Sequence, residues 1–338
     1  MRTIKFYVVL EGFNQRFPDE ETCRSYLEQV VWPKGRRCPH CGGQKSWPIT
    51  SDTVRVGLYE CAACGRQFTV TTKTPLHSTK LPLKTWLLAL FCLLNSSKGV
   101  SSVYLAKWIG TTQKTAWRMG HALRTLMALP IAVQEQLIGT VEVDETYVGG
   151  PPRPEPDVVH QRGRGTRNPC VLVVASRYAQ ARAAVVATAS YQEIAPLVQK
   201  FVSPEAVLNT DELSVYPKLG KEFADHDSVN HSAGEFARGT VHCNTAESFN
   251  AMLERARIGV FHHMSRFHLS KYLTEVIFRW NHRQPARVVV KNGKEKTLWE
   301  PMPVLAKIAS LMKYAVGIQL RRSDEGGIRV LPLPSFGG

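Results

Sequence analysis

The chain has 338 residues, 43% of them hydrophobic and 21% charged, which is typical of a globular protein with two or three domains and excludes a largely disordered chain. Its longest strongly apolar run, Trp86 to Leu94, is about half the length of a bilayer span. The N-terminus lacks a signal-peptide cleavage site, so we expect a cytoplasmic protein. Lysine and arginine total 43 against 28 acidic residues, a net charge of +15, which favours a polyanionic partner such as nucleic acid but says nothing about sequence specificity.

The first 80 residues are expected to hold a short helix and a zinc site. Residues 18–32 carry a helix-capping signal and apolar residues at helical spacing. The pattern C-x2-C-x19-C-x2-C then predicts a four-thiolate zinc site, and its ligands would be Cys38, Cys41, Cys61 and Cys64. A glycine follows the second cysteine of each pair, and the intervening residues alternate as short strands, so the segment is typical of a zinc ribbon. Four thiolates leave no open position on the ion, which makes the site structural rather than catalytic.

The other four cysteines do not fit that pattern. Disulfides are not expected in a cytosolic chain, so we interpret these residues as small buried side chains. They are Cys23, Cys92, Cys170 and Cys243.

Residues 82–128 are predicted to be helical. One helix ends near Gly110 and the next begins at Thr112 or Gln113, and two short helices joined through a glycine suit a helix-turn-helix. An α-hairpin that packs one domain on another fits the pattern equally well. In a helix-turn-helix, the second helix would offer several side chains to DNA, namely Gln113, Lys114, Arg118, His121 and Arg124.

From residue 139 the periodicity predicts three strands, a helix, a fourth strand and two later helices. These elements are expected at 140–148, 170–178, 181–190, 191–202, 204–212, 244–259 and 265–283. A loop rich in proline and arginine, at 149–169, separates the first two strands. The order indicates an α/β fold with a mixed sheet and flanking helices. The tail from about residue 323 is expected to be loosely ordered.

The segment VEVDETYVGG raises a question, because it places carboxylates in a strand of a basic chain. Asp144 lies on the first strand, Asp211 ends the fourth strand, and Glu247 opens a later helix. This order can bring three acids to one edge of a mixed sheet. Such like charges are costly unless a cation joins them, and two Mg²⁺ ions would do so. The sequence therefore favours a two-metal site that acts on phosphodiesters.

Each acid taken singly is more often structural than catalytic. Glu247, for example, could be a helix-start charge that meets the helix dipole. Glu145 and Glu212 each follow a candidate ligand and are expected to point to the opposite face of the sheet. Four histidines lie near the acids in sequence and could orient a phosphate or water, although local packing is the commoner role. They are His231, His242, His262 and His263.

From about Cys38 to Arg283 the chain resembles bacterial insertion-sequence transposases of the DDE class that carry an N-terminal zinc ribbon. The resemblance rests on several motifs: CPHCGG, YECAACGRQFTVTTKTPLHSTKLPLKTW, VEVDETYVGG, VLNTDE, VNHSAGEF, VHCNTAESFNAML and GVFHHMSRFHLSKYLTEVIFRWNHR. It implies a ribonuclease-H-like fold with Mg²⁺-dependent strand cleavage and transfer of the element's ends. Asp144, Asp211 and Glu247 would be the three acids, with Mn²⁺ able to replace Mg²⁺.

The resemblance also brings two departures. Some relatives use asparagine in the third role, and Asn244 lies one turn before Glu247; glutamate is the better Mg²⁺ ligand. Relatives often carry lysine seven residues after the third acid, where this chain has Glu254. Arg255 and Arg257 could compensate for that negative charge at a DNA phosphate.

Four segments are therefore expected. They are an N-terminal helix and zinc ribbon at 1–80, a helix-turn-helix-like DNA-binding region at 81–130, a ribonuclease-H-like catalytic domain at 138–290, and a C-terminal extension and tail at 291–338. The partner would be double-stranded DNA, as terminal inverted repeats and target, bound by at least a homodimer and without a membrane. The DNA contacts would be Gln113, Lys114, Arg118, Arg124, Arg255 and Arg257. The alternatives are a non-enzymatic zinc-ribbon regulator and a hydrolytic nuclease of the same fold.

Overall fold

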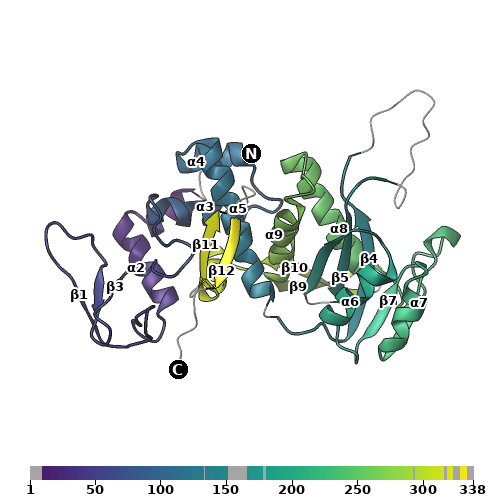
Figure 1. The fold of residues 1–338 in the computed structure, drawn as a ribbon. Coiled ribbons are helices and arrows are strands. Elements are labelled where there is room, and N and C mark those ends of the chain that lie inside the picture. Colours follow the sequence, from purple (N-terminus) through teal and green to yellow (C-terminus); the bar gives the residue numbers. More distant parts are fainter. Residues whose placement is uncertain are drawn as a thin grey trace. The chain divides into compact units, whose positions relative to one another are not determined.

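The computed structural model describes residues 10–132, 134–150, 166–177, 180–291, 294–315, 318–322 and 328–332. The chain separates into two compact units (Figure 1). One comprises Met1–Ser96, Val100–Pro130 and Met302–Gly338, and the other comprises Ser97–Gly99 and Ile131–Pro301. No helix in the described part of the chain is long and apolar enough to cross a membrane.

The first unit is mainly helical and carries a small antiparallel sheet in the order β1-β2-β3. Its elements are α2 (Glu20–Val31), β1 (Ser46–Pro48), β2 (Tyr59–Cys61), β3 (Gln67–Phe68), α3 (Leu83–Asn95), α4 (Ser102–Ile109), α5 (Gln113–Ala132), α10 (Val304–Lys313), β11 (Ile318–Arg322) and β12 (Ile328–Pro332).

Side chains from other elements hold the ends of α3. The carboxylate of Glu20, in the first turn of α2, accepts hydrogen bonds from the backbone N–H groups of Leu83 and Lys84 at 2.6 and 3.0 Å. These donors have no partner within their own helix, so the carboxylate caps it and meets the positive end of its dipole. At the other end, the buried Lys307 of α10 donates to the carbonyl of Leu94 at 2.5 Å.

Helices α4 and α5 are joined by a short turn, as the sequence predicts. Ser101 caps α4, and Gly110 ends it in a left-handed conformation with φ of 66°, which glycine adopts without strain. Thr112 then accepts a hydrogen bond from the backbone N–H of Thr115 at 3.2 Å and begins α5.

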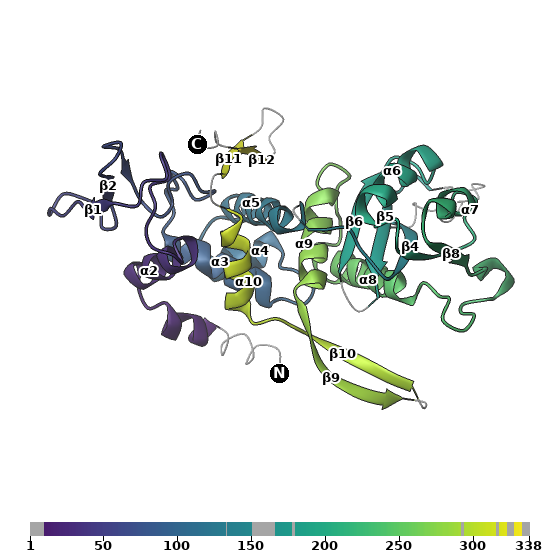
Figure 2. The same cartoon turned by 90° about the horizontal axis from the view of Figure 1, so that it is seen from below.

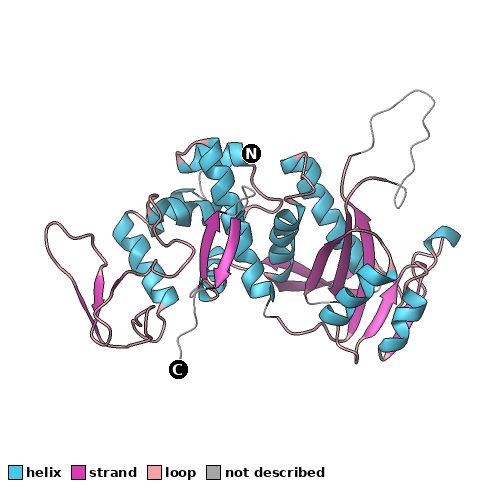
Figure 3. Ribbon diagram, viewed as in Figure 1, coloured by secondary structure: helices cyan, strands magenta, loops and turns pink. Residues whose placement is uncertain are grey.

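The second unit is built on a five-stranded mixed sheet (Figure 3). Its elements are β4 (Thr140–Tyr147), β5 (Cys170–Ser176), β6 (Ala181–Val186), α6 (Tyr191–Phe201), β7 (Val207–Thr210), α7 (Tyr216–Leu219), β8 (Asp225–Ser228), α8 (Asn244–Ala256), α9 (Leu269–Asn281), β9 (Arg283–Lys291) and β10 (Lys294–Pro301). The strand order is β6-β5-β4-β7-β8; β4, β5 and β6 are antiparallel neighbours, and β7 and β8 run parallel to β4. This confirms the predicted mixed sheet and has the strand order that a ribonuclease-H-like fold implies.

Helices cover both faces of this sheet, with α6 on one side and α8 and α9 on the other (Figure 2). Val141 and Val143 of β4 face the α6 layer, while Phe249 of α8 packs in the opposite layer. Residues of β4 alternate between the two layers because successive strand side chains point to opposite faces. The layer under α8 therefore receives Glu142 and Asp144.

The C-terminal region differs from the expectation in two places. Helix α9 ends at Asn281, and β9 and β10 follow it as an antiparallel hairpin that the sequence analysis did not predict (Figure 2). In addition, Ile328–Pro332 pairs with β11 as strand β12. The prediction of a loosely ordered tail is therefore wrong for these five residues, because backbone pairing gives them regular structure.

Candidate active site and zinc site

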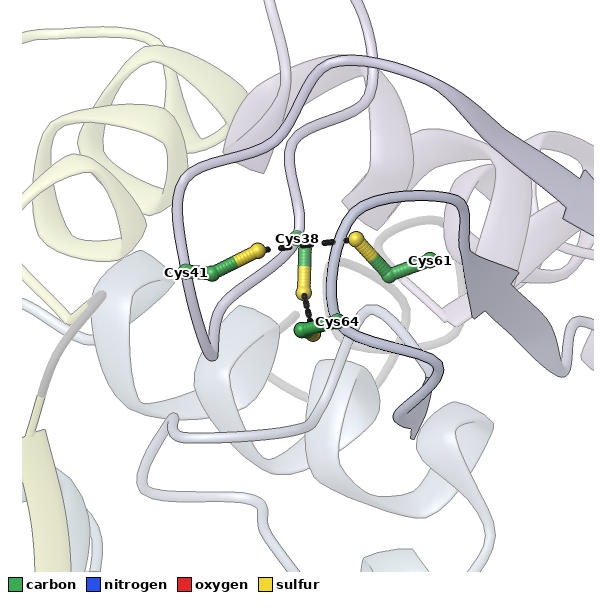
Figure 4. Close-up of side chains that lie close together, drawn as sticks. All are labelled: Cys38, Cys41, Cys61 and Cys64. Atoms are coloured by element: carbon green, nitrogen blue, oxygen red, sulfur yellow. Dashed lines mark hydrogen bonds between the residues drawn. The ribbon is translucent and has the colours of Figure 1, made fainter.

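The four predicted zinc ligands converge at the base of the small sheet, as Figure 4 shows. Their sulfur atoms all lie within 4.8 Å of one another, with Cys38 and Cys64 at 3.8 Å and Cys41 and Cys61 at 3.5 Å. The edge of a sulfur tetrahedron around Zn²⁺ is roughly 3.8 Å, given a Zn–S distance of about 2.3 Å. The thiol geometry therefore fits a structural zinc ion.

Glycines let the two cysteine-bearing turns close. Gly42 and Gly65 follow the second cysteine of each pair and have φ of 76° and 65°, a left-handed conformation that favours glycine. Gly43 lies so close to the sulfurs that a Cβ there would stand 3.2 Å from Cys61 Sγ and 3.3 Å from Cys41 Sγ. Burial acts to raise the pKa of the Cys61 thiol, but the backbone N–H groups of Cys64 and Ala63 overcome it, so the pKa falls to about 7. A lowered pKa favours the thiolate form that zinc binds.

Asp144 and Asp211 meet at the centre of the mixed sheet. Strands β4 and β7 are parallel neighbours with Val143 opposite Thr210, so the next residue of each strand is an aspartate. Carboxylate oxygens of Asp144, Glu145 and Asp211 all lie within 4.8 Å of one another. The structure thus brings together two of the three predicted acids and adds a neighbour of the first.

The surroundings of Asp144 disfavour its ionised form. Burial and the nearby carboxylates of Asp211 and Glu247 raise its pKa from the ordinary 3.8 to about 7, while His231 acts in the opposite direction. Asn250 of α8 donates a hydrogen bond to Asp144 Oδ2 at 2.8 Å. Close carboxylates that resist joint ionisation are stabilised by a divalent cation, and oxygen ligands suit Mg²⁺. The donor set therefore fits the ion that the resemblance implies.

Glu247 approaches this group but lies outside the set of three close carboxylates. It is about half exposed, and its Oε1 is 3.9 Å from His231 Nε2. Glu247 nevertheless raises the pKa of Asp144, so its carboxylate lies on the side of α8 that faces Asp144. Asn244, the alternative third ligand, instead lines a cleft with Arg177 and His242.

Glu145 lies on the opposite face of β4 from Asp144, as the sequence predicts, but it is close to the acids. On that face it accepts a hydrogen bond from the buried Tyr216 hydroxyl. Burial and the adjacent Glu145 raise the pKa of Tyr216 well above 10.0, so the phenol remains a donor. The Glu145 carboxylate nevertheless reaches the strand edge beside Asp144 and Asp211.

Glu212 anchors the loop that carries His231. Its carboxylate accepts hydrogen bonds from the backbone N–H of His231 at 2.9 Å and from the Ser232 hydroxyl at 2.6 Å. The Ser232 bond is the main reason that the pKa of Glu212 falls to about 2. Among the candidate histidines, His231 reaches the acids, whereas His262 and His263 are exposed.

Glu142 is not a metal ligand but a buried cap for α8. It is fully buried and accepts hydrogen bonds from the backbone N–H groups of Thr245 at 2.5 Å and Ala246 at 3.1 Å. Arg177 forms an ion pair with the same carboxylate at 2.6 Å. Burial and Arg177 lower the pKa of His242, whose Nδ1 is 3.1 Å from the guanidinium.

The candidate DNA contacts fall into two groups. Gln113, Lys114, Arg118 and Arg255 are exposed, although Gln113 also donates to the Ser102 hydroxyl at 2.8 Å. Arg124 is only 4% exposed, and its guanidinium lies 3.2 Å from the position of a Cβ on Gly120. Its side chain folds back over a glycine one turn earlier, so the DNA contact of Arg124 stays a prediction that would require this side chain to become exposed.

Arg257 forms an ion pair with Glu254, the residue whose negative charge it was expected to offset at DNA. The pair is formed through two guanidinium nitrogens, and Arg257 is 13% exposed. Glu254 raises the pKa of the guanidinium. The charges of Glu254 and Arg257 offset each other. Arg255 is therefore the exposed cation of α8 and of the helical turn Arg257–Phe261 that follows it.

The sequence analysis missed Asn250 and the Glu142–Arg177 pair. Asn250 lies three residues after Glu247, a spacing that places both on one face of a helix. Glu142 lies two residues before Asp144, on the same face of β4. These two spacings could have identified Asn250 and Glu142 from the sequence. No sequence pattern indicated that Arg177, which follows β5, pairs with Glu142.

Comparisons with known proteins agree with this geometry. An ISXO2-like transposase domain matches residues 136–281, and a transposase zinc-ribbon domain matches residues 18–67. The chain is also 29% identical over 302 residues to a protein in transposable element ISH50 of Halobacterium salinarum, across 83% of this chain and 98% of that protein.

Proposed function

This chain carries an ISXO2-like DDE transposase domain behind an N-terminal transposase zinc ribbon, and from that premise we propose that it binds the terminal inverted repeats of an insertion sequence and catalyses Mg²⁺-dependent strand cleavage and strand transfer. The observation that carries the proposal is the pairing of Asp144 and Asp211 on adjacent parallel strands, within 4.8 Å of each other. The similarity to a protein in a transposable element supports it.

Asp144, Asp211 and Glu247 are the residues that would hold Mg²⁺. Bound there, the ions would supply activation of an attacking oxygen and stabilisation of the leaving oxygen. Asn250 orients Asp144 through its hydrogen bond, and Glu145 is a further carboxylate at the strand edge. Mn²⁺ prefers the same oxygen ligands and should support the reaction as well.

The first unit would hold DNA through the zinc ribbon and α5. Lys114 and Arg118 are exposed and one helical turn apart, so they project from the same face of α5. Contacts from such a pair to phosphates release counterions. Lys114→Ala and Arg118→Ala should each weaken duplex binding and reduce the slope of log affinity against log salt concentration by about one. A fluorescence anisotropy titration over a range of KCl measures both effects.

Two alternatives can be weighed on the same site. A non-enzymatic regulator has no reason to gather three carboxylates at the end of core strands, where their mutual repulsion costs stability. A hydrolytic nuclease would use the same acids, and only the fate of the cut end distinguishes it from a transposase.

The test uses purified full-length chain and a labelled duplex that contains the element's terminal repeat with its flanking sequence. Wild type is compared in Mg²⁺ and in EDTA with Asp144→Asn, Asp211→Asn and Glu247→Gln. The matched control is Asp225→Asn, an exposed aspartate at the start of β8. We expect wild type and the control to cut the duplex and join the end to a second duplex only in Mg²⁺. The three site variants should bind DNA but lose activity by about a thousandfold or more.

Each other outcome identifies a different function. Binding that is equal in all variants, with no metal-dependent cleavage by wild type, would favour the regulator. Cleavage without joining would favour the nuclease. Full activity of Glu247→Gln alone would remove Glu247 from the ligand set and leave Glu145 as the third carboxylate to test.

A further inference from the structure

A cleft of about 560 Å³ lies beside the acidic site within the unit that contains residues 131–301. Its walls come from the end of β5, from α8, from the end of α9 and from β10. Arg255 and Arg283 contribute positive charge, whereas Arg177 is paired with Glu142 and Glu295 adds one negative charge. Trp280 and Trp299 contribute aromatic surface. An anionic ligand with a flat apolar part matches this combination.

The aromatic and cationic groups are arranged in layers. The Arg283 guanidinium lies 3.5 Å from the centroid of the Trp280 ring and 5.7 Å from that of Trp299. Its Nε donates to the Trp280 carbonyl at 2.9 Å, which fixes its plane. Planar guanidinium groups and indole rings are the side chains on which nucleobases stack.

Trp280 supplies a separate indication of a ligand. The residue is only 6% exposed, and its Nε1–H has no hydrogen-bond partner among the described residues. An unsatisfied buried donor is costly, and tryptophan N–H groups usually find an acceptor when buried. A ligand that offers an oxygen or ring nitrogen in the cleft would satisfy it.

The cleft and the acids flank the same helix. Ser248, Met252 and Arg255 form the cleft side of α8, while Glu247 and Asn250 face Asp144. With about 3.6 residues per turn, the two sides are separated by roughly a third of a turn. DNA whose backbone lies at the acids therefore passes within one helix width of the cleft.

We propose that this cleft binds a single unpaired nucleotide of the substrate DNA, extruded next to the cleaved phosphodiester. The base stacks on Trp299 and Arg283, its polar edge accepts from Trp280 Nε1, and Arg255 contacts the attached phosphate. This inference rests on the proposed function, because it places the nucleotide in DNA bound at Asp144. Contacts to the phosphates of a paired duplex need exposed cations only and leave the buried Trp280 donor unexplained.

The experiment measures binding without cleavage, in buffer without Mg²⁺. Duplexes with the terminal repeat carry a single mismatch, scanned one position at a time across the cleavage site. A mismatch removes most of the cost of unpairing. At one or two positions it should tighten binding by wild type about tenfold, because a mismatched base enters the cleft without that cost.

The variants assign that gain to the cleft. Trp299→Ala and Arg283→Ala should lose the tenfold gain yet bind the fully paired duplex within about twofold of wild type. Trp299→Phe, which still stacks, should retain most of it. Val290→Ala on the same hairpin is the matched control, because Val290 is 71% exposed and does not line the cleft.

Photocrosslinking provides a second readout that does not depend on affinity. 5-Iodouracil at the sensitive position should crosslink to a peptide that contains Trp280 or Trp299. The proposal is overturned if no mismatch tightens binding, or if the gain persists in both Trp299→Ala and Arg283→Ala. Failure of the proposed function is a different result: wild type would then not cleave in Mg²⁺, whatever the mismatch does.

Discussion

The pKa of Asp144 depends strongly on the groups around its side chain. Its pKa in the folded chain is about 7, against an ordinary value of 3.8. The folded state therefore favours the protonated form. The stability that this group contributes is fully present below about pH 4 and is lost as the pH rises through about 7.

The Asp144→Asn variant has no carboxyl group at this position, so it does not lose this stability as the pH rises. At pH 8 in EDTA the variant should be more stable than wild type by on the order of 2 kcal/mol, a value that discounts the full shift for solvent screening. Near pH 4 the difference should vanish. Thermal unfolding at several pH values measures it, and Asp225→Asn serves as the control.

The same side chain should report metal binding. Mg²⁺ at pH 8 should raise the melting temperature of wild type, because it binds the ionised carboxylates of the folded state only. It should leave Asp144→Asn almost unchanged. If the melting temperature of wild type changes neither with pH nor with Mg²⁺, Asp144 does not belong to a metal site.

Individual residues differed in how far the sequence revealed them. Asp144 and Asp211 were predictable from their places on two predicted strands and from the family resemblance, and the structure makes those strands parallel neighbours. The role of Glu142 was not, because its partners Arg177 and Thr245 lie 35 and 103 residues away. The burial of Arg124 was not predicted, because burial depends on tertiary packing, which helical spacing does not contain.

One buried carboxylate, that of Glu142, joins strand β4 to the first turn of helix α8. Glu142→Gln should cost about 3–5 kcal/mol of unfolding free energy, because it leaves Arg177 without its partner and weakens the cap of α8. Urea denaturation measures the loss. The exposed pair of Asp227 and Arg238 has the same 2.6 Å separation, so Asp227→Asn is a matched control that should cost less than about 1 kcal/mol.

A double-mutant cycle separates the pair from the cap. Arg177→Met in the Glu142→Gln background should restore part of the lost stability, because no unpaired guanidinium then remains. If the double variant is as unstable as the sum of the single variants, the ion pair contributes nothing and the backbone cap carries the whole effect.

The zinc ribbon offers a substitution that leaves all four ligands in place. Gly43→Ala introduces a Cβ 3.2–3.3 Å from the sulfurs of Cys61 and Cys41, so these sulfurs must move by a few tenths of an ångström. It should weaken zinc affinity by about tenfold or more, the range typical of changes next to the ligands. Competition with a chelator measures this. Gly12→Ala is the control, since nothing lies within 4 Å of a Cβ there.

Elements also varied in their predictability. Most helices and strands of the second unit were readable from periodicity, and the helix predicted at 244–259 appears as α8 at Asn244–Ala256. The β9–β10 hairpin was missed although RVVVKNGKEKTLW contains β-branched residues on both sides of an Asn-Gly pair. That dipeptide between apolar runs is a strong hairpin signal, and it went unused because the family motifs end at Arg283.

At the scale of the whole molecule, strand transfer requires two element ends in one complex. We expect light scattering of the chain with a terminal-repeat duplex to give a mass equal to two duplexes and two chains of 37.8 kDa each. A scrambled duplex should not give this species. Efficient strand transfer by complexes that hold one chain and one duplex at every concentration would contradict the prediction.

The division into four segments stays a prediction, whereas the mixed sheet with flanking helices was predicted from the sequence, although its fifth strand β8 was not. Chain order and the preference of consecutive strands for adjacent positions already limit the possible topologies. The grouping of Met302–Gly338 with the N-terminal residues had no signal in local pattern, because it depends on long-range contacts such as that between Lys307 and Leu94.

The Glu142 cap also has a consequence for biosynthesis. β4 leaves the ribosome 103 residues before the N–H groups of α8 that Glu142 needs, and a carboxylate without those donors resists burial. The Glu142 carboxylate therefore gains its backbone donors only when α8 is made, and the same event brings Glu247 toward Asp144. A chain that ends before α8 consequently has neither the donors that cap Glu142 nor the approach of Glu247 to Asp144.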